Sequence, residues 1–410
     1  MTDIDLWSPA EKADPYPGYA RIRQEAPVHR AAGPMGTDTW VITRYEDVRA
    51  ALADPRLSKD PKYAPQWVTD MGILAEDGGV IGRNLLSYDP PDHTRLRRLV
   101  AKAFTRRRME GLRPHVQEIT DRLLDDLAGR TEVDLLGALA FPLPITVICE
   151  LLGVPVADRA DFRAWTTAFV SAPFTPEGVA HGKESMIRLG AYVRDLIGVK
   201  RAAIDPGADA DEMPDLISAL IVAADDGDRL TEDELVSMAR LLLIAGHETT
   251  VNLIGNGTLA LLTHPDQLDL LKADPGLLPG AVEELLRYDG PVERATPRFT
   301  SEAVTYSGVT IPKNSHVTVV LAAADRDDGH VPEPDRLDIT REGHGHVAFG
   351  HGIHFCLGAP LARIEAQVAI GSLLRRYPDV VLAVPPGDVR WRPGGPAEII
   401  RGLESLPIRI

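Results

Sequence analysis

The sequence predicts a mainly α-helical fold with a minor β portion, in a single large domain over residues 1–410. Apolar residues three or four apart indicate helices in nine segments: 93–128, 139–151, 158–170, 181–203, 212–224, 232–263, 265–273, 278–288 and 360–376. Strand-like runs are short, and they occur at 39–45, at 316–323 and near the C-terminus. The 33 prolines and 35 glycines are spread evenly, so no low-complexity linker divides the chain.

Composition narrows the class of protein. The net charge of -16 disfavours nucleic acid as the main partner. No run approaches the roughly 20 apolar residues of a membrane span, and the N-terminus lacks the pattern of a signal peptide. Two cysteines cannot build a disulfide framework, which fits a reducing compartment. We therefore expect a cytoplasmic protein without a membrane segment.

Each element can be examined in chain order, and the first informative one is irregular. Residues 56–90 show no steady period over a length that is unusual for a loop in a compact domain. Such a loop is either a lid or binding segment, or a surface loop without a role in function. The segments 139–151 and 158–224 read as ordinary helices. Cys149 lies among apolar residues, so we interpret it as a buried and inert thiol.

The central segment 232–263 reads as one helix of roughly 45 Å at 1.5 Å per residue. Its middle, "AGHETT", is polar between apolar flanks, which is unusual for a core helix. The pair His247–Glu248 could begin the zinc-protease motif HExxH, but that motif requires histidine where this chain has Val251. Thr249 can instead donate to the carbonyl four residues back, and Gly246 would leave room beside a bound ligand.

The other cysteine, Cys356, stands in "FGHGIHFCLGAPLAR", at residues 349–363. A helix begins directly after it, and exposed N–H groups at a helix start favour a thiolate. Glycines at 350, 352 and 358 permit positive φ and close approach to a flat ligand. Three kinds of site remain open: zinc bound with nearby histidines, a cysteine nucleophile, or a haem iron with one axial thiolate. Histidines suited to zinc stand at 344, 346, 351 and 354.

The cysteine loop resembles the haem-binding loop of the cytochrome P450 family, F-x-x-G-x-[HR]-x-C-x-G. The matching residues are Phe349, Gly352, His354, Cys356 and Gly358, and the resemblance extends over the whole chain. It implies the family fold, with heme b between the central helix and the helix after the cysteine. It also implies that Cys356 ligates the iron as thiolate and that Phe349, Gly350 and Gly358 help to bind the cofactor.

Further residues match the family by position. The middle of the central helix resembles its oxygen-activation motif, with Ala245, Gly246, Glu248 and Thr249. The resemblance implies that Thr249 hydrogen-bonds O2 and that Glu248 helps to bring protons from solvent. It also implies a structural pair and four contacts to the haem carboxylates. The pair is Glu284 and Arg287, with Arg336 as a further contact of the arginine, and the haem contacts are His93, Arg97, Arg298 and His354.

The implied activity is monooxygenation, with electrons from ferredoxin and ferredoxin reductase because no flavin or nicotinamide domain is visible. The implied substrate is large and mostly apolar, such as a macrolide or other polyketide that is hydroxylated or epoxidised. Its pocket walls would come from 60–90, 165–185, 242–248, 291–296 and 397–400. Steroids, secosteroids, terpenes and xenobiotics remain alternative substrates, as do a peroxide-driven enzyme and a non-catalytic haem sensor.

One stretch of this acidic chain is rich in basic residues, and these suit the docking of an acidic ferredoxin. We expect the protein to be a monomer. They are Arg95, Arg97, Arg98, Lys102, Arg106, Arg107, Arg108 and Arg113. Relatives usually carry asparagine or histidine at the position of Asp325, a difference that we expect to affect the scaffold rather than the chemistry.

Overall fold

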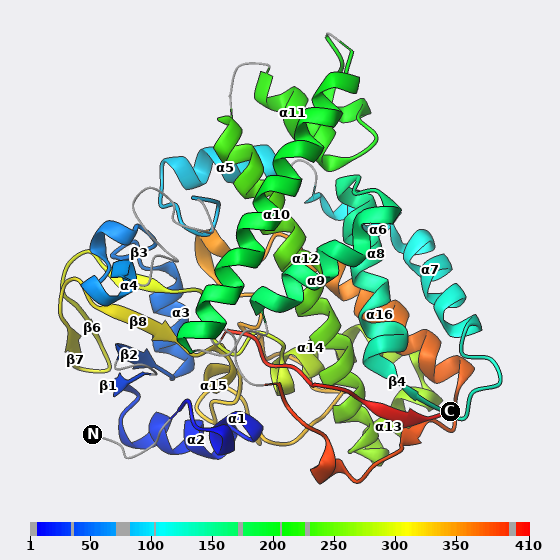
Figure 1. Ribbon diagram of the computed structural model, residues 1–410. Coiled ribbons are helices and arrows are strands. Elements are labelled where there is room, and N and C mark those ends of the chain that lie inside the picture. The colour runs from blue at the N-terminus through cyan, green and yellow to red at the C-terminus, as the bar shows by residue number, and fades with distance from the viewer. Residues whose placement is uncertain are drawn as a thin grey trace.

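A computed structural model describes residues 6–33, 37–70, 83–101, 104–170, 175–205, 207–225, 230–392 and 399–410. Helices dominate, and the sheet that contains β1, β2 and β8 lies on one side of the molecule with the N-terminal helices (Figure 1). The helices are α1 Pro9–Ala13, α2 Tyr16–Glu25, α3 Tyr45–Ala53, α4 Gln66–Asp70, α5 Asp92–Ala101, α6 Arg106–Gly111, α7 Arg113–Asp125, α8 Pro142–Leu152, α9 Arg159–Val170, α10 Pro176–Ala203, α11 Leu216–Asp225, α12 Glu232–Leu262, α13 Pro265–Ala273, α14 Leu278–Asp289, α15 Leu321–Asp325 and α16 Ala359–Arg376.

Three sheets make up the β portion of the described chain. The largest has the strand order β1-β2-β8-β5-β3, with β2 and β8 parallel and the other pairs antiparallel. The others have the orders β4-β10-β9 and β6-β7. The strands are β1 Val28–Ala32, β2 Asp38–Ile42, β3 Leu57–Ser58, β4 Glu132–Asp134, β5 Arg298–Thr300, β6 Val304–Tyr306, β7 Val309–Ile311, β8 His316–Val319, β9 Val381–Leu382 and β10 Pro407–Arg409.

The central helix α12 is confirmed at 31 residues and runs through the middle of the molecule (Figure 1). Its start is fixed by a capping box, in which the Thr231 hydroxyl accepts from Glu234 N and the Glu234 carboxylate accepts from Thr231 N. It packs against α8, α10, α14 and α16, and the largest hydrophobic cluster surrounds it. Because α16 follows the cysteine loop, this packing fixes the loop relative to α12.

The predicted helix 93–128 is wrong as one element, because the described chain forms three helices there, α5, α6 and α7. Thr105 caps α6 by accepting from Arg108 N, and Pro114 occupies the first turn of α7, where its missing N–H costs nothing. The strand predictions at 39–45 and 316–323 are correct only at their starts. Each strand is followed directly by a short helix, α3 or α15, which the alternating pattern concealed.

No helix among the described residues is long and apolar enough to cross a membrane. Parts of three predicted pocket walls lie outside the described residues, namely 71–82, 171–174 and 397–398. The same holds for Lys102 of the basic stretch.

Candidate functional site

The cysteine loop folds back on itself in a tight turn just before α16. The Cys356 N–H donates to the Phe349 carbonyl at 2.9 Å, and the Gly350 N–H donates to Val347 O at 2.7 Å. Gly350 and Gly352 have φ values of 73° and 75°, a left-handed conformation that side chains strain. The loop therefore needs these two glycines to bring Cys356 to the start of the helix.

The glycines of the loop serve different purposes. A Cβ on Gly352 would lie 3.0 Å from the Leu52 carbonyl oxygen, so its absence lets the loop pack on α3. The expectation of a positive φ at Gly358 is wrong, because its φ is -80°. A Cβ there would lie 4.0 Å from the Cys356 sulfur, in van der Waals contact. Gly358 thus keeps the vicinity of the sulfur free of side chains.

Burial and nearby charged or N–H groups have opposing effects on the pKa of the Cys356 thiol. The residue is exposed, yet enough protein surrounds the sulfur that burial raises the pKa of its thiol above the ordinary value. The N–H groups of Gly358 and Ala359, together with Arg97 and Arg363, act in the opposite direction. The groups that favour the thiolate are therefore present, but the effect of burial outweighs them. A cation bound to the sulfur would supply the stabilisation that the thiolate still needs.

Beside the loop, the structure brings together the four cationic or donor residues that were predicted from three separate segments. His93 and Arg97 lie one turn apart on α5, Arg298 lies on β5, and His354 lies in the loop. The rings of His93 and His354 are 4.4 Å apart between centroids. Arg97 also donates to the carbonyl of Phe355 at 2.7 Å. The predicted cluster is therefore a real spatial cluster.

Several buried nitrogen atoms of this cluster lack a hydrogen-bond partner within the described part of the chain. His93 Nε2, Arg298 Nε and His354 Nδ1 are buried there without a hydrogen-bond partner. Burial lowers the pKa of His354 to about 2, with further lowering by Lys59, Arg298, His93 and Arg97. Unpaired buried donors in a positive environment are costly unless an anion binds. The residues thus fit a group that carries carboxylates, as haem does.

Lys59 belongs to this cluster and was missed in the sequence, where it lies in the irregular stretch after β3. It is buried, and its Nζ donates to the carbonyls of Thr296 and Pro297, both at 2.9 Å. Burial, and then Arg298, lower the pKa of Lys59 well below its ordinary value. Its contacts hold the chain directly before Arg298, so Lys59 positions that arginine. A lone lysine in a loop gives no sequence signal for such a role.

The middle of α12 is partly exposed, whereas a helix in the core of a protein is normally buried. Ala245 is exposed and its neighbours Ile244 and Gly246 are half-buried, and Thr249 Oγ1 donates to Ala245 O at 3.1 Å, as predicted. The reason given for Gly246 is corrected. A Cβ there would lie 2.7 Å from two carbons of Ile148, so glycine is required by the packing of α12 on α8.

Glu248 is buried and ion-paired. Its Oε1 lies 2.5 Å from Arg392 Nη1, and its Oε2 lies 3.8 Å from His247 Nε2. His247 is fully buried between the rings of Phe141 and Phe162. No group of three or more His, Cys, Asp or Glu side chains placed to hold a metal ion occurs in the described ranges. The zinc alternatives thus gain no support, and the contact of Glu248 with Arg392 was not foreseen.

The structural pair forms as predicted, and Arg287 contacts Arg336 as expected. Arg287 donates from Nε and Nη2 to the two oxygens of Glu284, at 2.7 and 2.9 Å, and both side chains are buried. Arg287 contacts Arg336 only through the backbone carbonyl, at 3.2 Å. The second guanidinium on Glu284 belongs to Arg341, at 3.2 Å. Both arginines stand in the stretch 332–341, and spacing alone does not show that Arg341 also reaches Glu284.

A second bracing network was not predicted. Glu283, next to the structural pair on α14, accepts from Arg363 of α16 at 2.7 Å and from His346 at 3.1 Å. These contacts lower the pKa of Glu283 to about 2 against the opposing effect of burial. The Arg363 guanidinium lies over the Phe349 ring, 4.6 Å from its centroid. Both ends of the cysteine loop are therefore tied to α14.

The buried carboxyl group of Asp325 should make the stability of the folded protein depend on pH. It is buried, it accepts from Val347 N at 2.7 Å, and burial raises its pKa to about 7. An aspartate is near 3.9 in the unfolded chain, so the folded state binds the extra proton and loses stability as pH rises from about 4 to 7. We expect Asp325→Asn to keep the hydrogen bond and to gain on the order of 4 kcal/mol at pH 8, but only about a third of that at pH 5.

Thermal unfolding of the haem-loaded variant at both pH values checks this expectation. Asp327→Asn is the matched control two residues away, because Asp327 accepts from Tyr45 N at 2.8 Å and lies 3.6 Å from Arg23 Nε. That variant should lose stability at both pH values. An equal effect of Asp325→Asn at pH 5 and pH 8 would contradict the explanation.

The fold and this site together define a haem-thiolate protein. The family model described as Cytochrome P450 matches residues 276–386. The chain is 52% identical over 413 residues to Cytochrome P450 107B1 of Saccharopolyspora erythraea, covering 100% of this chain and 98% of the relative. It is 50% identical over 414 residues to Vitamin D(3) 25-hydroxylase of Pseudonocardia autotrophica, covering 98% and 96%. The chain belongs to the cytochrome P450 family.

A solved structure agrees with the fold. The tirandamycin C-bound P450 monooxygenase TamI superimposes with a TM-score of 0.88 at 46% identity, covering 98% of each chain. The protein is accordingly a monooxygenase whose cofactor is a cysteine-ligated haem, and Cys356 is the ligand. Cys149 is fully buried on α8, where burial raises the pKa of its thiol to about 12. The resemblance seen in the cysteine loop is confirmed.

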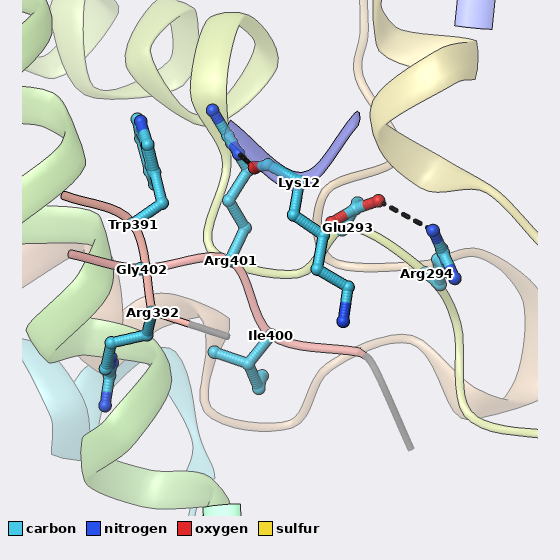
Figure 2. A pocket seen from close by; sticks show the side chains of 8 residues that line it. All are labelled: Lys12, Glu293, Arg294, Trp391, Arg392, Ile400, Arg401 and Gly402. Atoms are coloured by element: carbon cyan, nitrogen blue, oxygen red, sulfur yellow. Dashed lines mark hydrogen bonds and ion pairs between the residues drawn. The ribbon is translucent and has the colours of Figure 1, made fainter. Parts of the chain in front are cut away.

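Two of the predicted pocket walls meet at a small pocket that is polar rather than apolar (Figure 2). Segment 291–296 contributes Glu293 and Arg294, and segment 397–400 contributes Ile400. The other lining residues are Lys12, Trp391, Arg392, Arg401 and Gly402. Four cationic side chains around one carboxylate do not suit an apolar substrate. This pocket is thus not the predicted substrate pocket.

Proposed function

We propose that the protein hydroxylates or epoxidises a large and mostly apolar macrolide or other polyketide, using O2 and electrons from a ferredoxin. The observation that carries the proposal is the pair of Glu248 and Thr249 on α12, in a family whose relatives act as hydroxylases in polyketide and macrolide pathways. We further propose that the enzyme acts as a cytoplasmic monomer of one domain.

The proposed assignments within the haem site follow the geometry. His93, Arg97, Arg298 and His354 hold the haem carboxylates, and the buried unpaired nitrogens of three of them support this role. Phe349 and the two glycines at 350 and 358 shape the loop around the sulfur. The bound haem supplies the activation of O2, and its thiolate ligand favours cleavage of the O–O bond.

In this proposal, Glu248 and Thr249 of α12 hold and transfer the protons that the reaction needs. The Thr249 hydroxyl lies at an open part of the helix and can hydrogen-bond the O2 substrate or a water molecule. Glu248 stands at the next position and connects this part of the helix with groups nearer the solvent. The small side chain of Ala245, which is exposed, keeps the helix surface low beside them. Such placement supports proton transfer to oxygen at a fixed place.

A search for substrate-induced shifts of the haem absorption band tests the substrate class. Vitamin D3 and tirandamycin C are natural first probes, because they stand in the names of two similar proteins. A macrolide library should give shifts and hydroxylated products, whereas shifts with vitamin D3 alone would favour a secosteroid hydroxylase instead. Turnover with hydrogen peroxide as fast as with ferredoxin would contradict the proposed electron supply.

The proposed ferredoxin surface comprises α6 and the cysteine loop. Arg106 and Arg107 are exposed on α6, and Ile353 and Phe355 of the loop are exposed beside the cysteine. Arg95 and Arg113 do not contribute freely, since Arg95 pairs with Glu234 and Arg113 with Glu110. The basic patch is therefore narrower than the sequence suggested, and it lies on a helix that packs against α16.

Reduction by ferredoxin should slow as salt increases, because exposed charges are screened. Reversing the charge of Arg106 and Arg107 to glutamate should lower the reduction rate at low salt about tenfold or more. Stopped-flow reduction of the haem-loaded protein measures both effects. Arg188→Glu on α10 is the control, and a rate independent of ionic strength would remove the proposed surface.

A further inference from the structure

Lys59 lies at the end of the β3–β5 ladder, next to the chain that leads to Arg298. It follows β3 directly, and its Nζ donates to Thr296 O and Pro297 O at 2.9 Å and to Thr296 Oγ1 at 2.5 Å. An ammonium group has three hydrogens, so each of them meets one acceptor. Because Thr296 and Pro297 lead directly into β5, these bonds fix the chain at the point where Arg298 begins.

Asp89 connects the same lysine with helix α5. Its carboxylate accepts from the Lys59 N–H at 3.1 Å and from the Ser58 hydroxyl, and its carbonyl accepts from the His93 N–H at 3.0 Å. His93 is buried in the first turn of α5. Lys59 and Asp89 therefore link α5 with β5, which are two of the three segments that supply the cation cluster beside the cysteine loop.

The ammonium of Lys59 is buried among neutral acceptors. The residue is 3% exposed, and the acceptors are two carbonyls and a hydroxyl. A buried charge of this kind is costly unless an opposite charge lies near it. The haem carboxylates would supply that charge. They would do so without a hydrogen bond to Lys59, because its three ammonium hydrogens already have acceptors.

We propose that Lys59 serves the haem site in two ways: it positions Arg298 for the haem carboxylates, and its buried positive charge favours the reduced iron. The inference rests on the proposed role of Arg298 as a contact of those carboxylates. Reduction by one electron adds a negative charge, and a buried cation stabilises it because charges are screened less inside a protein than in water. Asp89 has the opposite effect, since it is an anion that acts on the same cations.

The test measures the reduction potential of the haem and the rate of haem transfer to apomyoglobin, both in the substrate-free, haem-loaded protein. Lys59→Met keeps an unbranched side chain but removes the charge and the three hydrogen bonds. Its equilibrium constant for reduction should fall about tenfold, which is about 59 mV for one electron. Haem transfer should become about tenfold faster, because Arg298 loses its support.

Two further variants separate the charge from the positioning. Lys59→Arg keeps the positive charge, so its potential should stay close to that of the wild type even where the larger guanidinium loosens the haem. Asp89→Asn removes a negative charge, so its potential should rise. Lys62→Met is the matched control, because Lys62 is exposed three residues away and pairs with Asp60 at 2.9 Å. This control should keep both the potential and the rate of haem transfer.

A wild-type potential in haem-loaded Lys59→Met would overturn the inference. A fall of the potential in Asp89→Asn would overturn it as well, because a site that is merely loosened shifts in the same direction in both variants. If Lys59→Met does not retain haem, Lys59→Arg and Asp89→Asn decide the question by the same criteria. The proposed role of Arg298 fails separately, if Arg298→Gln retains haem as well as the wild type does. None of these measurements uses O2 or substrate, so they do not depend on the proposed reaction.

Discussion

Replacement of Cys356 by serine is expected to abolish the strongly red-shifted absorption band that reduced haem-thiolate proteins show with carbon monoxide. A serine hydroxyl is far less acidic than a thiol, so the iron loses its anionic sulfur ligand. The cation cluster of His93, Arg97 and Arg298 remains in this variant. Haem should therefore still bind, without the thiolate signature and with hydroxylation below detection.

The same variant separates ligation from folding. The N–H of residue 356 still donates to Phe349 O, and the two left-handed glycines are unchanged, so the loop should keep its shape. Carbon monoxide difference spectra of the reduced protein provide the measurement. Cys149→Ser is the control, and it should keep the red-shifted band because that thiol is buried on α8. A red-shifted band in the Cys356 variant would exclude this cysteine as the ligand.

The sequence predicted those parts of the site that short-range spacing determines. Cys356 before a helix and Thr249 four residues after Ala245 are local patterns, so the loop turn and the bond to Ala245 followed from them. The long helix was equally clear, because apolar periodicity over 31 residues has no competing explanation. The proposed contacts of α5, β5 and the loop with the haem carboxylates needed the family resemblance, since nothing local links these segments.

What could not be predicted depends on contacts between distant segments. Arg392 meets Glu248 across 144 residues of sequence, and Lys59 holds the carbonyls before Arg298 from a loop without periodicity. Gly246 shows the same limit, because its reason is the side chain of Ile148 on another helix. The contact of Arg341 with Glu284 was not predicted, since the turn of the intervening chain decides which side chain points inward. Tertiary packing, not composition, sets each of these.

The short helices were missed for a different reason. α3 and α15 are 9 and 5 residues long, and each follows a strand without a break in the apolar pattern. Over such lengths a helical period and a strand period predict similar apolar positions. The split of 93–128 into three helices has the opposite origin. The apolar periodicity of this segment is real, but Thr105 caps α6 and Pro114 stands in the first turn of α7. A periodicity averaged over the whole segment does not reveal these two helix starts.

Thr249→Ala is expected to separate electron consumption from product formation. The variant loses the hydroxyl at an open part of α12. In the proposed function, this hydroxyl hydrogen-bonds the O2 substrate and places a proton donor beside it. Without that donor, reduced oxygen should leave as hydrogen peroxide before a C–H bond is oxidised. Product per electron pair should fall about tenfold to a hundredfold, because positioned proton-transfer groups contribute effects of this scale and more.

Helix stability should change little, because the lost bond to Ala245 O is an interaction within the helix and alanine is the better helix former. The measurement is the ratio of product and of peroxide to NADH consumed, with the substrate that the absorption screen selects. Thr249→Ser keeps a hydroxyl and should recover most of the coupling. Thr250→Ala is the matched control, since Thr250 is buried at the next position and points about 100° away. Unchanged coupling in Thr249→Ala would show that the hydroxyl has no part in proton delivery, and Glu248 would then have to act through water alone.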